Sequence, residues 1–208
     1  MKNGLFIVID GIDGSGKSEI VKMLHNYLFS KHKKYRILTT REPTYGKYGN
    51  QIRQILRIEN DPKKSSKRLM ELLIKDREQH LRNTIQLFLE KSNKHELNIV
   101  LCDRYYYSTI AFQGAQGLDV RELIERNKGF RKPDIAFILD VSPNIALKRI
   151  AHRQKEKFEQ LEFMKKIRNN FLKMPKLLDD NIWIIDANKP LKKVFDDVKK
   201  NINKLLIN

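Results

Sequence analysis

The stretch GIDGSGKS, residues 11–18, constrains this chain more strongly than any other part of its sequence. It matches G-x-x-x-x-G-K-[S/T] at every fixed position. An apolar run (LFIVI, 5–9) precedes it, and apolar residues with helical spacing follow it. A strand, a glycine-rich turn and a helix in this order form a phosphate-binding loop, because backbone N–H groups and the helix N-terminus converge on phosphate oxygens. The motif therefore predicts that the chain binds a nucleoside triphosphate.

Each position of this loop has an expected task. The three glycines allow the backbone to turn so that its N–H groups point inward. Lys17 is expected to reach the β- and γ-phosphates, and Ser18 is expected to bind Mg²⁺, the predicted cofactor. The residues of the loop that we predict to bind the triphosphate are Gly11, Ile12, Asp13, Gly14, Ser15, Gly16, Lys17 and Ser18.

The apolar runs predict the fold class. Five short runs are expected to be buried strands, at residues 5–9, 36–40, 98–102, 135–140 and 182–186. They are continuous rather than alternating, as in parallel strands that are covered on both faces. Segments with helical spacing lie between them, and one closes the chain at residues 190–207. We therefore expect an α/β fold: a doubly wound, five-stranded parallel sheet flanked by helices, of the P-loop NTPase type.

Length and composition narrow the organisation of the chain. Its 208 residues suit one domain, expected to span residues 1–208. The segment 151–177 carries many charges and is expected to hold few core residues, and its first part is expected to be exposed. No apolar run reaches the roughly 18 residues that a membrane span needs, so no membrane partner is expected. The single cysteine, Cys102, ends an apolar run, which predicts a buried thiol and fits a reducing cytoplasm.

The formal net charge of +17 raises the question of nucleic-acid binding. The lysines are spread along the chain, and acidic residues accompany them in KHELN (94–98), RELIER (121–126) and FDDVKKN (195–201). Solvated helices give the same total, and so does an enzyme whose substrates are polyanions. No specific nucleic-acid partner is therefore expected.

The class of phosphate-loop protein follows from what accompanies the loop. GTPases read guanine with N-K-x-D, but Leu191 stands where IDANKP (185–190) would need the aspartate. Motor and helicase families are usually larger than 208 residues, so a small-molecule kinase is the expected class. Asp103 and Arg104 follow the run 98–102, at the end of a strand where ligands bind in α/β sheets. A carboxylate there can hold Mg²⁺, and a guanidinium fork suits a phosphate.

The sequence around these two residues resembles the thymidylate kinase family. LCDRYYYSTIAF (101–112) is similar to the family's most specific signature, a hydrophobic pair followed by D-R-[YFH]-x-x-S-x-x-A-[FY]. Four further segments resemble family motifs in the same order: TREPTYG (40–46), ELLIKDREQH (71–80), KPDIAFILDVSPNIALKRIAHR (132–153) and IIDAN (184–188). The resemblance implies phosphoryl transfer from ATP to dTMP, giving dTDP, and a homodimer, which is the common state of the family.

The resemblance also implies roles for single residues. The expected catalytic residues are Lys17, Arg104, Arg153 and Asp13, and the expected metal ligands are Ser18 and Asp103. The residues expected to bind dTMP are Arg41, Glu42, Arg77, Arg104, Ser108, Thr109, Phe112 and Gln113. Among these, Arg104 would hold the phosphate of dTMP, Arg77 would read a thymine carbonyl, and Phe112 would crowd a 2′-hydroxyl. Tyr106 and Tyr107 are expected to serve packing.

A mobile lid is expected at about residues 149–160. Some members of the family place a catalytic arginine inside the phosphate loop, where this chain has Gly14, so the positive charge must come from the lid. Arg149 is expected to bind ATP, and Arg153 is the first choice for the catalytic cation. Lys157 stands where the family commonly has arginine, and lysine cannot form the bidentate fork.

Three alternatives remain open from the sequence. Leu73 and Ile74 stand where the family usually has a phenylalanine that stacks on the base, which leaves room for a broader (deoxy)nucleoside monophosphate kinase. A deoxynucleoside kinase, whose acceptor lacks a phosphate, is the second. The third belongs to another class: a basic P-loop protein that binds nucleic acid and has no kinase activity, as the net charge of +17 suggests.

Overall fold

The computed structural model describes residues 4–58, 64–91, 95–150 and 158–207. Its strands are β1 (Gly4–Gly11), β2 (Tyr35–Arg41), β3 (Leu97–Asp103), β4 (Ile135–Asp140) and β5 (Ile182–Asp186). They form one sheet in the order β2-β3-β1-β4-β5, and every pairing is parallel. The predicted α/β class and the five predicted strands are confirmed, each strand within a few residues of its apolar run.

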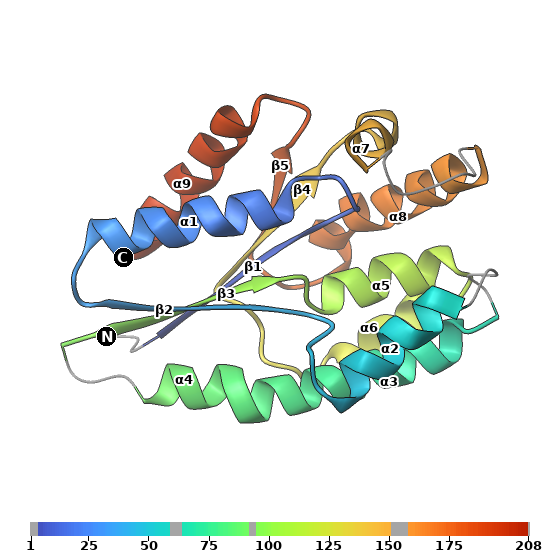
Figure 1. Ribbon diagram of the computed structural model, residues 1–208, viewed down its shortest axis with the longest axis horizontal. Coiled ribbons are helices and arrows are strands. Elements are labelled where there is room, and N and C mark those ends of the chain that lie inside the picture. Colours follow the sequence, from blue (N-terminus) through green and yellow to red (C-terminus); the bar gives the residue numbers. More distant parts are fainter. Residues whose placement is uncertain (1–3, 59–63, 92–94, 151–157, 208) are drawn as a thin grey trace.

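Helices cover both faces of this sheet (Figure 1). The helices in the described part of the chain are α1 (Lys17–Lys31), α2 (Lys47–Ile58), α3 (Ser66–His80), the π-helical turn η1 (Leu81–Ile85), α4 (Gln86–Glu90), α5 (Tyr106–Ala115), α6 (Val120–Asn127), α7 (Pro143–Ile150), α8 (Phe158–Leu177) and α9 (Leu191–Ile207). The helices α1 and α9 pack on one face, and α4, α5 and α8 pack on the other (Figure 1). This double covering explains why the strands are continuous apolar runs.

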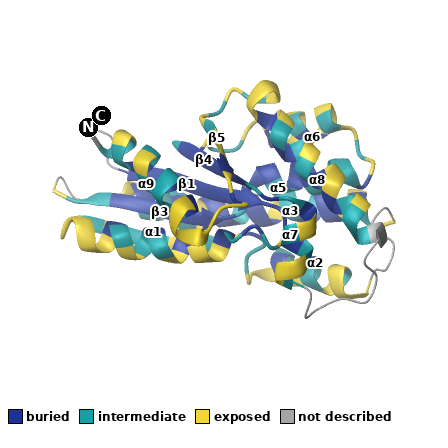
Figure 2. Cartoon of the chain, turned by 90° about the horizontal axis from the view of Figure 1, so that it is seen from above, coloured by how far each residue is buried: buried dark blue, intermediate teal, exposed yellow. Residues whose placement is uncertain are grey.

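Burial is deepest in the three central strands (Figure 2). Every residue of β1 is buried, as are all but one residue each of β3 and β4. The edge strands differ, because each has one neighbour only. β2 has no fully buried residue, and β5 leaves Trp183 and Ile184 exposed. The strands β1 and β3 are parallel neighbours near the middle of the sheet, so their carboxyl ends lie side by side. The phosphate loop follows the carboxyl end of β1.

The expectation that residues 151–177 hold few core residues is wrong where the structure describes them. The helix α8 buries Met164, Ile167, Phe171 and Met174 in the main core, although charged residues surround them in the sequence. Their spacing of three and four residues gathers these four apolar side chains on one face of the helix. The many charged residues between these four made the apolar periodicity hard to recognise in the sequence. Residues 151–157, the part expected to be exposed, lie outside the described residues.

Cys102 and the tyrosines after β3 are core residues, as expected. The thiol of Cys102 is buried, and burial raises its pKa well above the ordinary value. Tyr106 and Tyr107 are also buried, and the hydroxyls of both reach the carboxylate of Asp180. This contact ties the start of α5 to the loop before β5. Among the described residues, no helix has the length and apolar character that crossing a membrane requires.

Candidate active site

The phosphate loop joins β1 to α1 in the predicted strand–loop–helix order. Gly14 has φ +79°, and a Cβ there would lie 2.5 Å from the carbonyl oxygen of Ala146 in α7. Both observations require glycine at this position, because L-residues rarely adopt that backbone and the contact is with another main chain. An arginine inside the loop at this position would meet the same two obstacles.

Lys17 begins α1 beneath the loop. Its ammonium group donates to the carbonyl oxygen of Ile12 at 2.9 Å, and the residue is buried. Burial, and after it the positive charge of Arg104, lower the pKa of Lys17 to about 8. A phosphate that enters the loop would supply the negative charge that this buried cation needs.

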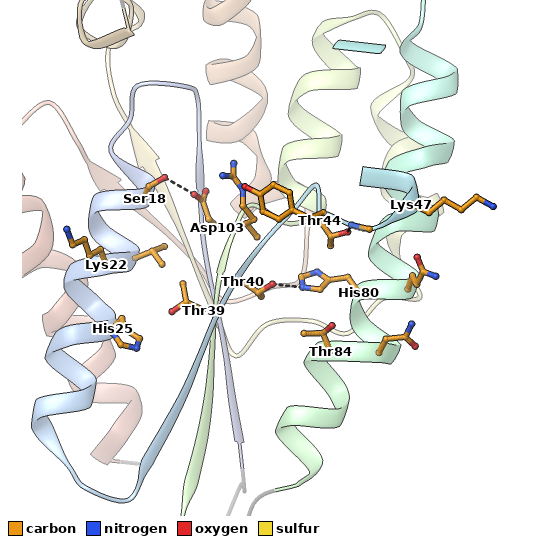
Figure 3. Close-up of a pocket in the computed structure, with 16 residues that line it drawn as sticks. Ser18, Lys22, His25, Thr39, Thr40, Thr44, Lys47, His80, Thr84 and Asp103 are labelled. Carbon is orange, nitrogen blue, oxygen red and sulfur yellow. Dashed lines mark hydrogen bonds between the residues drawn. The ribbon is translucent and has the colours of Figure 1, made fainter. Parts of the chain in front are cut away.

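Ser18 and Asp103 face each other across the ends of α1 and β3 (Figure 3). The hydroxyl of Ser18 donates to Oδ2 of Asp103 at 2.9 Å. The other carboxylate oxygen, Oδ1, is buried and has no hydrogen-bond partner in the described part of the chain. A hydroxyl beside an unpartnered carboxylate oxygen suits a hard divalent cation, which prefers oxygen ligands. The described residues hold no cluster of three or more His, Cys, Asp or Glu that would bind a metal alone. The nucleotide's phosphates would supply the other ligands.

Arg104 connects β3 to the phosphate loop. It adopts φ +73°, which is uncommon for a residue other than glycine, and its N–H donates to the carbonyl oxygen of Ile9 at 3.0 Å. Its guanidinium donates to Oδ1 of Asp13 at 2.6 Å and to Oγ of Ser108 at 2.8 Å, and it lies 5.1 Å from the ring centre of Phe112. Four predicted site residues therefore meet at one point.

Asp10 supports this cluster from below, and no sequence motif indicated it. Its carboxylate is fully buried and accepts from the N–H groups of Tyr105 and Ser108, at 3.1 and 3.0 Å, and from the Ser108 hydroxyl at 2.7 Å. Burial raises the pKa of Asp10, and Arg104, the Ser108 hydroxyl, the N–H of Gly11 and Lys17 act in the opposite direction. The available signal was an acidic residue between the apolar run 5–9 and Gly11.

Arg77 lies in a second cluster, between α3 and α5. It is buried, and its three nitrogens donate to Oε2 of Glu42 (2.9 Å), Oδ1 of Asn127 (2.6 Å) and Oγ1 of Thr109 (2.9 Å). The guanidinium carbon also lies over the rings of Tyr105 and Phe130, 5.2 and 5.6 Å from their centres. The structure thus brings Arg77, Glu42 and Thr109 together, with Asn127 as a partner that no sequence motif indicated.

Known proteins resemble this chain over nearly its whole length. The family model described as thymidylate kinase matches residues 9–198. The chain belongs to the thymidylate kinase family. It is 36% identical to a probable thymidylate kinase of Archaeoglobus fulgidus, over 97% of this chain and 96% of that protein. It is 37% identical to a thymidylate kinase of Caldicellulosiruptor saccharolyticus over 98% of each chain, and 35% identical to a probable thymidylate kinase of Pyrococcus horikoshii over 94% of each. The resemblance seen in the sequence is confirmed.

Arg41 and Gln113, which the family resemblance assigned to dTMP, belong to neither the Arg104 cluster nor the Arg77 cluster. Arg41 is exposed at the end of β2, where it lines a pocket with Ser18 and Asp103 rather than joining Arg77. Gln113 is buried and donates to Gln116 at 3.1 Å, while its own amide oxygen has no partner among the described residues. An unpartnered buried oxygen is available to a ligand.

The expected lid of this thymidylate kinase family member lies only partly in the described structure. Arg149, in α7, donates to the carbonyl oxygens of Gly14 and Ala187, both at 3.2 Å. It therefore lies directly over the phosphate loop. Arg153, the predicted catalytic cation, lies outside the described residues, as do Lys155 and Lys157.

Proposed function

We propose that this chain transfers the γ-phosphoryl group of ATP to dTMP, giving ADP and dTDP. Membership of the thymidylate kinase family across residues 9–198 supports this reaction. The observation that carries it is the contact of Arg104 with Asp13, because it sets a phosphate-binding guanidinium against the phosphate loop. An acceptor phosphate on Arg104 would then lie beside the triphosphate of the donor.

Phosphoryl transfer requires positioning and charge more than covalent chemistry. Lys17 and the loop's backbone N–H groups hold the donor. Arg104 holds the acceptor phosphate, and Asp13, which accepts a hydrogen bond from Arg104, lies beside it. Ser18 and Asp103 would hold Mg²⁺, which supplies charge that stabilises the transferring phosphoryl group when it is bound. Support for the metal comes from the unpartnered Oδ1 of Asp103 beside the Ser18 hydroxyl.

The base end of dTMP is proposed to meet Arg77 and the α5 residues Thr109, Phe112 and Gln113. Arg77 already donates to Thr109, so a thymine carbonyl near this wall would lie within reach of the same guanidinium. Glu42 and Asn127 then act on dTMP indirectly, by fixing the plane of Arg77. Ser108 belongs to the phosphate end, because it contacts Arg104.

The remaining proposals concern the surroundings of the site. We propose one domain over residues 1–208 with a lid at about 149–160, in which Arg149 contacts ATP and Arg153 supplies the catalytic charge. We also propose a homodimer, supported by the exposed Leu56 and Ile58 on α2, and a cytoplasmic location, supported by the buried, reduced Cys102.

Rates with a panel of acceptors test the function. Release of ADP from ATP is measured with dTMP, dUMP, UMP, CMP, AMP and GMP, each at a series of concentrations. The expected result is the highest kcat/KM with dTMP, and the variant Lys17→Ala serves as the control for turnover outside the phosphate loop. Equal rates with ribonucleotides would overturn the thymidylate assignment, and tight salt-dependent DNA binding without turnover would overturn the kinase itself.

A further inference from the structure

A cavity of about 920 Å³ lies at the open edge of the sheet, beside β2, and we call it the β2-edge pocket. Its walls come from α1, the end of β2, the loop before α2, and the junction of α3 with η1 (Figure 3). It reaches Ser18 and Asp103 at one end. Arg77 and Arg104, which the proposed function assigns to the base and the acceptor phosphate of dTMP, are not part of the lining that the structure describes. The pocket is therefore distinct from the cleft between these two arginines, although it adjoins the catalytic site through the proposed metal ligands Ser18 and Asp103 and contains Arg41, which the family resemblance assigned to dTMP.

The lining of this pocket suits an anion with several acceptor oxygens. The hydroxyls of Thr39, Thr40 and Thr84 lie along it (Figure 3). Lys22, Arg41 and Lys47 also belong to the lining, whereas Asp103 is its single carboxylate among the described residues. The side chains of Lys22 and Lys47 extend away from the threonine hydroxyls, so their charges act from the outside of the pocket (Figure 3). Hydroxyl donors in a pocket surrounded by an excess of cations favour a phosphate group. The volume of about 920 Å³ is within the range of pockets for small organic ligands.

A departure from regular helix geometry occurs at the same pocket. The helix that contains α3 and α4 is interrupted by the π-helical turn η1, Leu81–Ile85, and Asn83 and Thr84 of this turn line the cavity. The turn's sequence, LRNTI, contains neither proline nor glycine that would impose a break. Single π-turns within α-helices occur frequently at functional sites, because the extra residue redirects the side chains around it.

One series of hydrogen bonds leads from the pocket wall to Arg77. His80 lines the pocket, and its Nε2 lies 2.7 Å from Oγ1 of Thr40 (Figure 3). Its Nδ1 lies 3.1 Å from Oε1 of Glu42, whose other oxygen accepts from Arg77. Glu42, Arg77 and His80 are all buried, so a change at His80 alters the environment of a carboxylate that has few other partners.

We propose that the β2-edge pocket is a second binding site, for a phosphorylated small molecule, and that its occupant acts on Arg77 through His80 and Glu42. An anion between Thr40 and Thr84 draws His80 away from Glu42, and Arg77 then loses part of the support that fixes its plane. Occupancy is therefore expected to weaken dTMP binding. The binding site stands on the pocket alone, whereas its effect on dTMP rests on the proposed function.

Binding is tested by NMR on the intact protein. The chain has five histidines, of which His25 and His80 line the pocket, so carbon-correlated imidazole signals report on it. Inorganic phosphate and ribose 5-phosphate are the two probes, with ADP and dTMP filling the catalytic cleft and sodium chloride at equal ionic strength as the blank. Signals of His25 and His80 are assigned by His25→Gln and His80→Gln. Both are expected to shift saturably, while those of the other histidines stay unchanged.

Thr84→Glu places a carboxylate in the pocket and is expected to weaken the apparent affinity at least tenfold. Gln54→Glu, on the exposed side of α2, adds the same charge outside the pocket and is expected to change nothing. Thr39→Glu repeats the test if Thr84→Glu lowers the melting temperature. Shifts that do not saturate, that include all five histidines equally, or that persist in both pocket variants would overturn the site.

The effect on catalysis is tested separately. Ribose 5-phosphate is expected to raise KM for dTMP about fivefold or more, with kcat nearly unchanged, and to lose this effect in Thr84→Glu and in His80→Gln. Saturable binding with an unchanged KM would overturn the connection to Arg77 and leave the site standing. Absence of dTMP turnover would remove the proposed function and the connection together, while the NMR titration would still decide whether the pocket binds phosphate.

Discussion

The guanidinium of Arg104 donates to the carboxylate of Asp13 at 2.6 Å and thereby joins the end of β3 to the phosphate loop. These two residues are 91 positions apart in the chain. Their contact places the proposed acceptor phosphate next to the donor site, and it rests on Asp10, which holds the backbone after Arg104 by two N–H groups. The first prediction concerns this contact.

Arg104→Lys keeps the positive charge but removes the planar fork. We expect KM for dTMP to rise about tenfold or more, because an ammonium group cannot bind a phosphate through two parallel hydrogen bonds as the planar guanidinium does. KM for ATP is expected to change little. Arg36→Lys is the matched control, since Arg36 forms its ion pair with Glu96 far from the loop. Steady-state kinetics with each substrate varied in turn provide the measurement, and an unchanged KM for dTMP would contradict the role of Arg104.

Glu42→Gln removes the charge that balances buried Arg77. The substitution leaves a guanidinium with little solvent around it, so the free energy of unfolding is expected to fall by about 3 kcal/mol or more. Urea unfolding at pH 7 measures the loss. Glu96→Gln removes the partner of exposed Arg36 and is expected to leave stability nearly unchanged. Equal effects of the two substitutions would show that burial of the Glu42 pair contributes nothing.

Gly14→Ala tests the close approach of the phosphate loop to α7. The new methyl group meets the Ala146 carbonyl oxygen at 2.5 Å on a backbone with φ +79°, so either the loop or α7 must move. Stability is expected to fall by about 1–3 kcal/mol, and kcat with it, because Arg149 is carried on the same helix. Gly129→Ala is the control, since a Cβ there has nothing within 4 Å. Thermal unfolding and steady-state kinetics are measured for both variants. Equal stability and equal kcat in the two would contradict the close approach of the loop to α7.

Lys17 makes the stability of the nucleotide-free protein depend on pH. Its folded pKa of about 8 is below the ordinary 10.5, because burial and then Arg104 disfavour the charged form. Between these values the unfolded chain binds the proton that the folded chain has lost. The contribution of Lys17 to the free energy of unfolding therefore rises with pH, is complete above about pH 10.5, and is lost as pH falls through about 8. Its size is on the order of 3 kcal/mol.

The variant Lys17→Met isolates this contribution from all other titrating groups. At pH 7 the variant is expected to be more stable than the wild type, because it buries no charge. The difference between the two free energies of unfolding is expected to shrink steadily towards pH 10.5. Chemical denaturation at intervals of half a pH unit measures it. A difference that stays constant over this range would show that Lys17 keeps its ordinary pKa.

The proximity of two segments could be predicted where each segment consists of consecutive residues. The phosphate loop and the pair Asp103–Arg104 each follow an apolar strand, and parallel strands end at the same edge of the sheet, so their meeting could be expected. The strands themselves were found because burial on both faces leaves an uninterrupted apolar run.

The residues that were missed act through partners that are distant in the sequence. Asp10 supports a loop 95 positions later, and Asn127 reaches Arg77 from 50 positions away. His80 connects β2 to α3 in the same manner, over 40 positions. A lone polar residue in an apolar run or on a helix face gives no sign of which partner it will meet. The buried stripe of α8 was overlooked for a different reason: total charge hides a periodic pattern.

The position of β1 at the centre of the sheet has a consequence for biosynthesis. Its partners are β3 and β4, so Gly4 pairs with Asn98 and Ile7 with Ile135. Such long sequence separations make strand pairing slow, because the intervening chain must be closed into a loop first. A ribosome has to deliver about two thirds of the polypeptide before the first strand gains both neighbours. Until then this strand, every residue of which is buried in the folded protein, lacks at least one neighbour, and its apolar side chains are open to binding by chaperones.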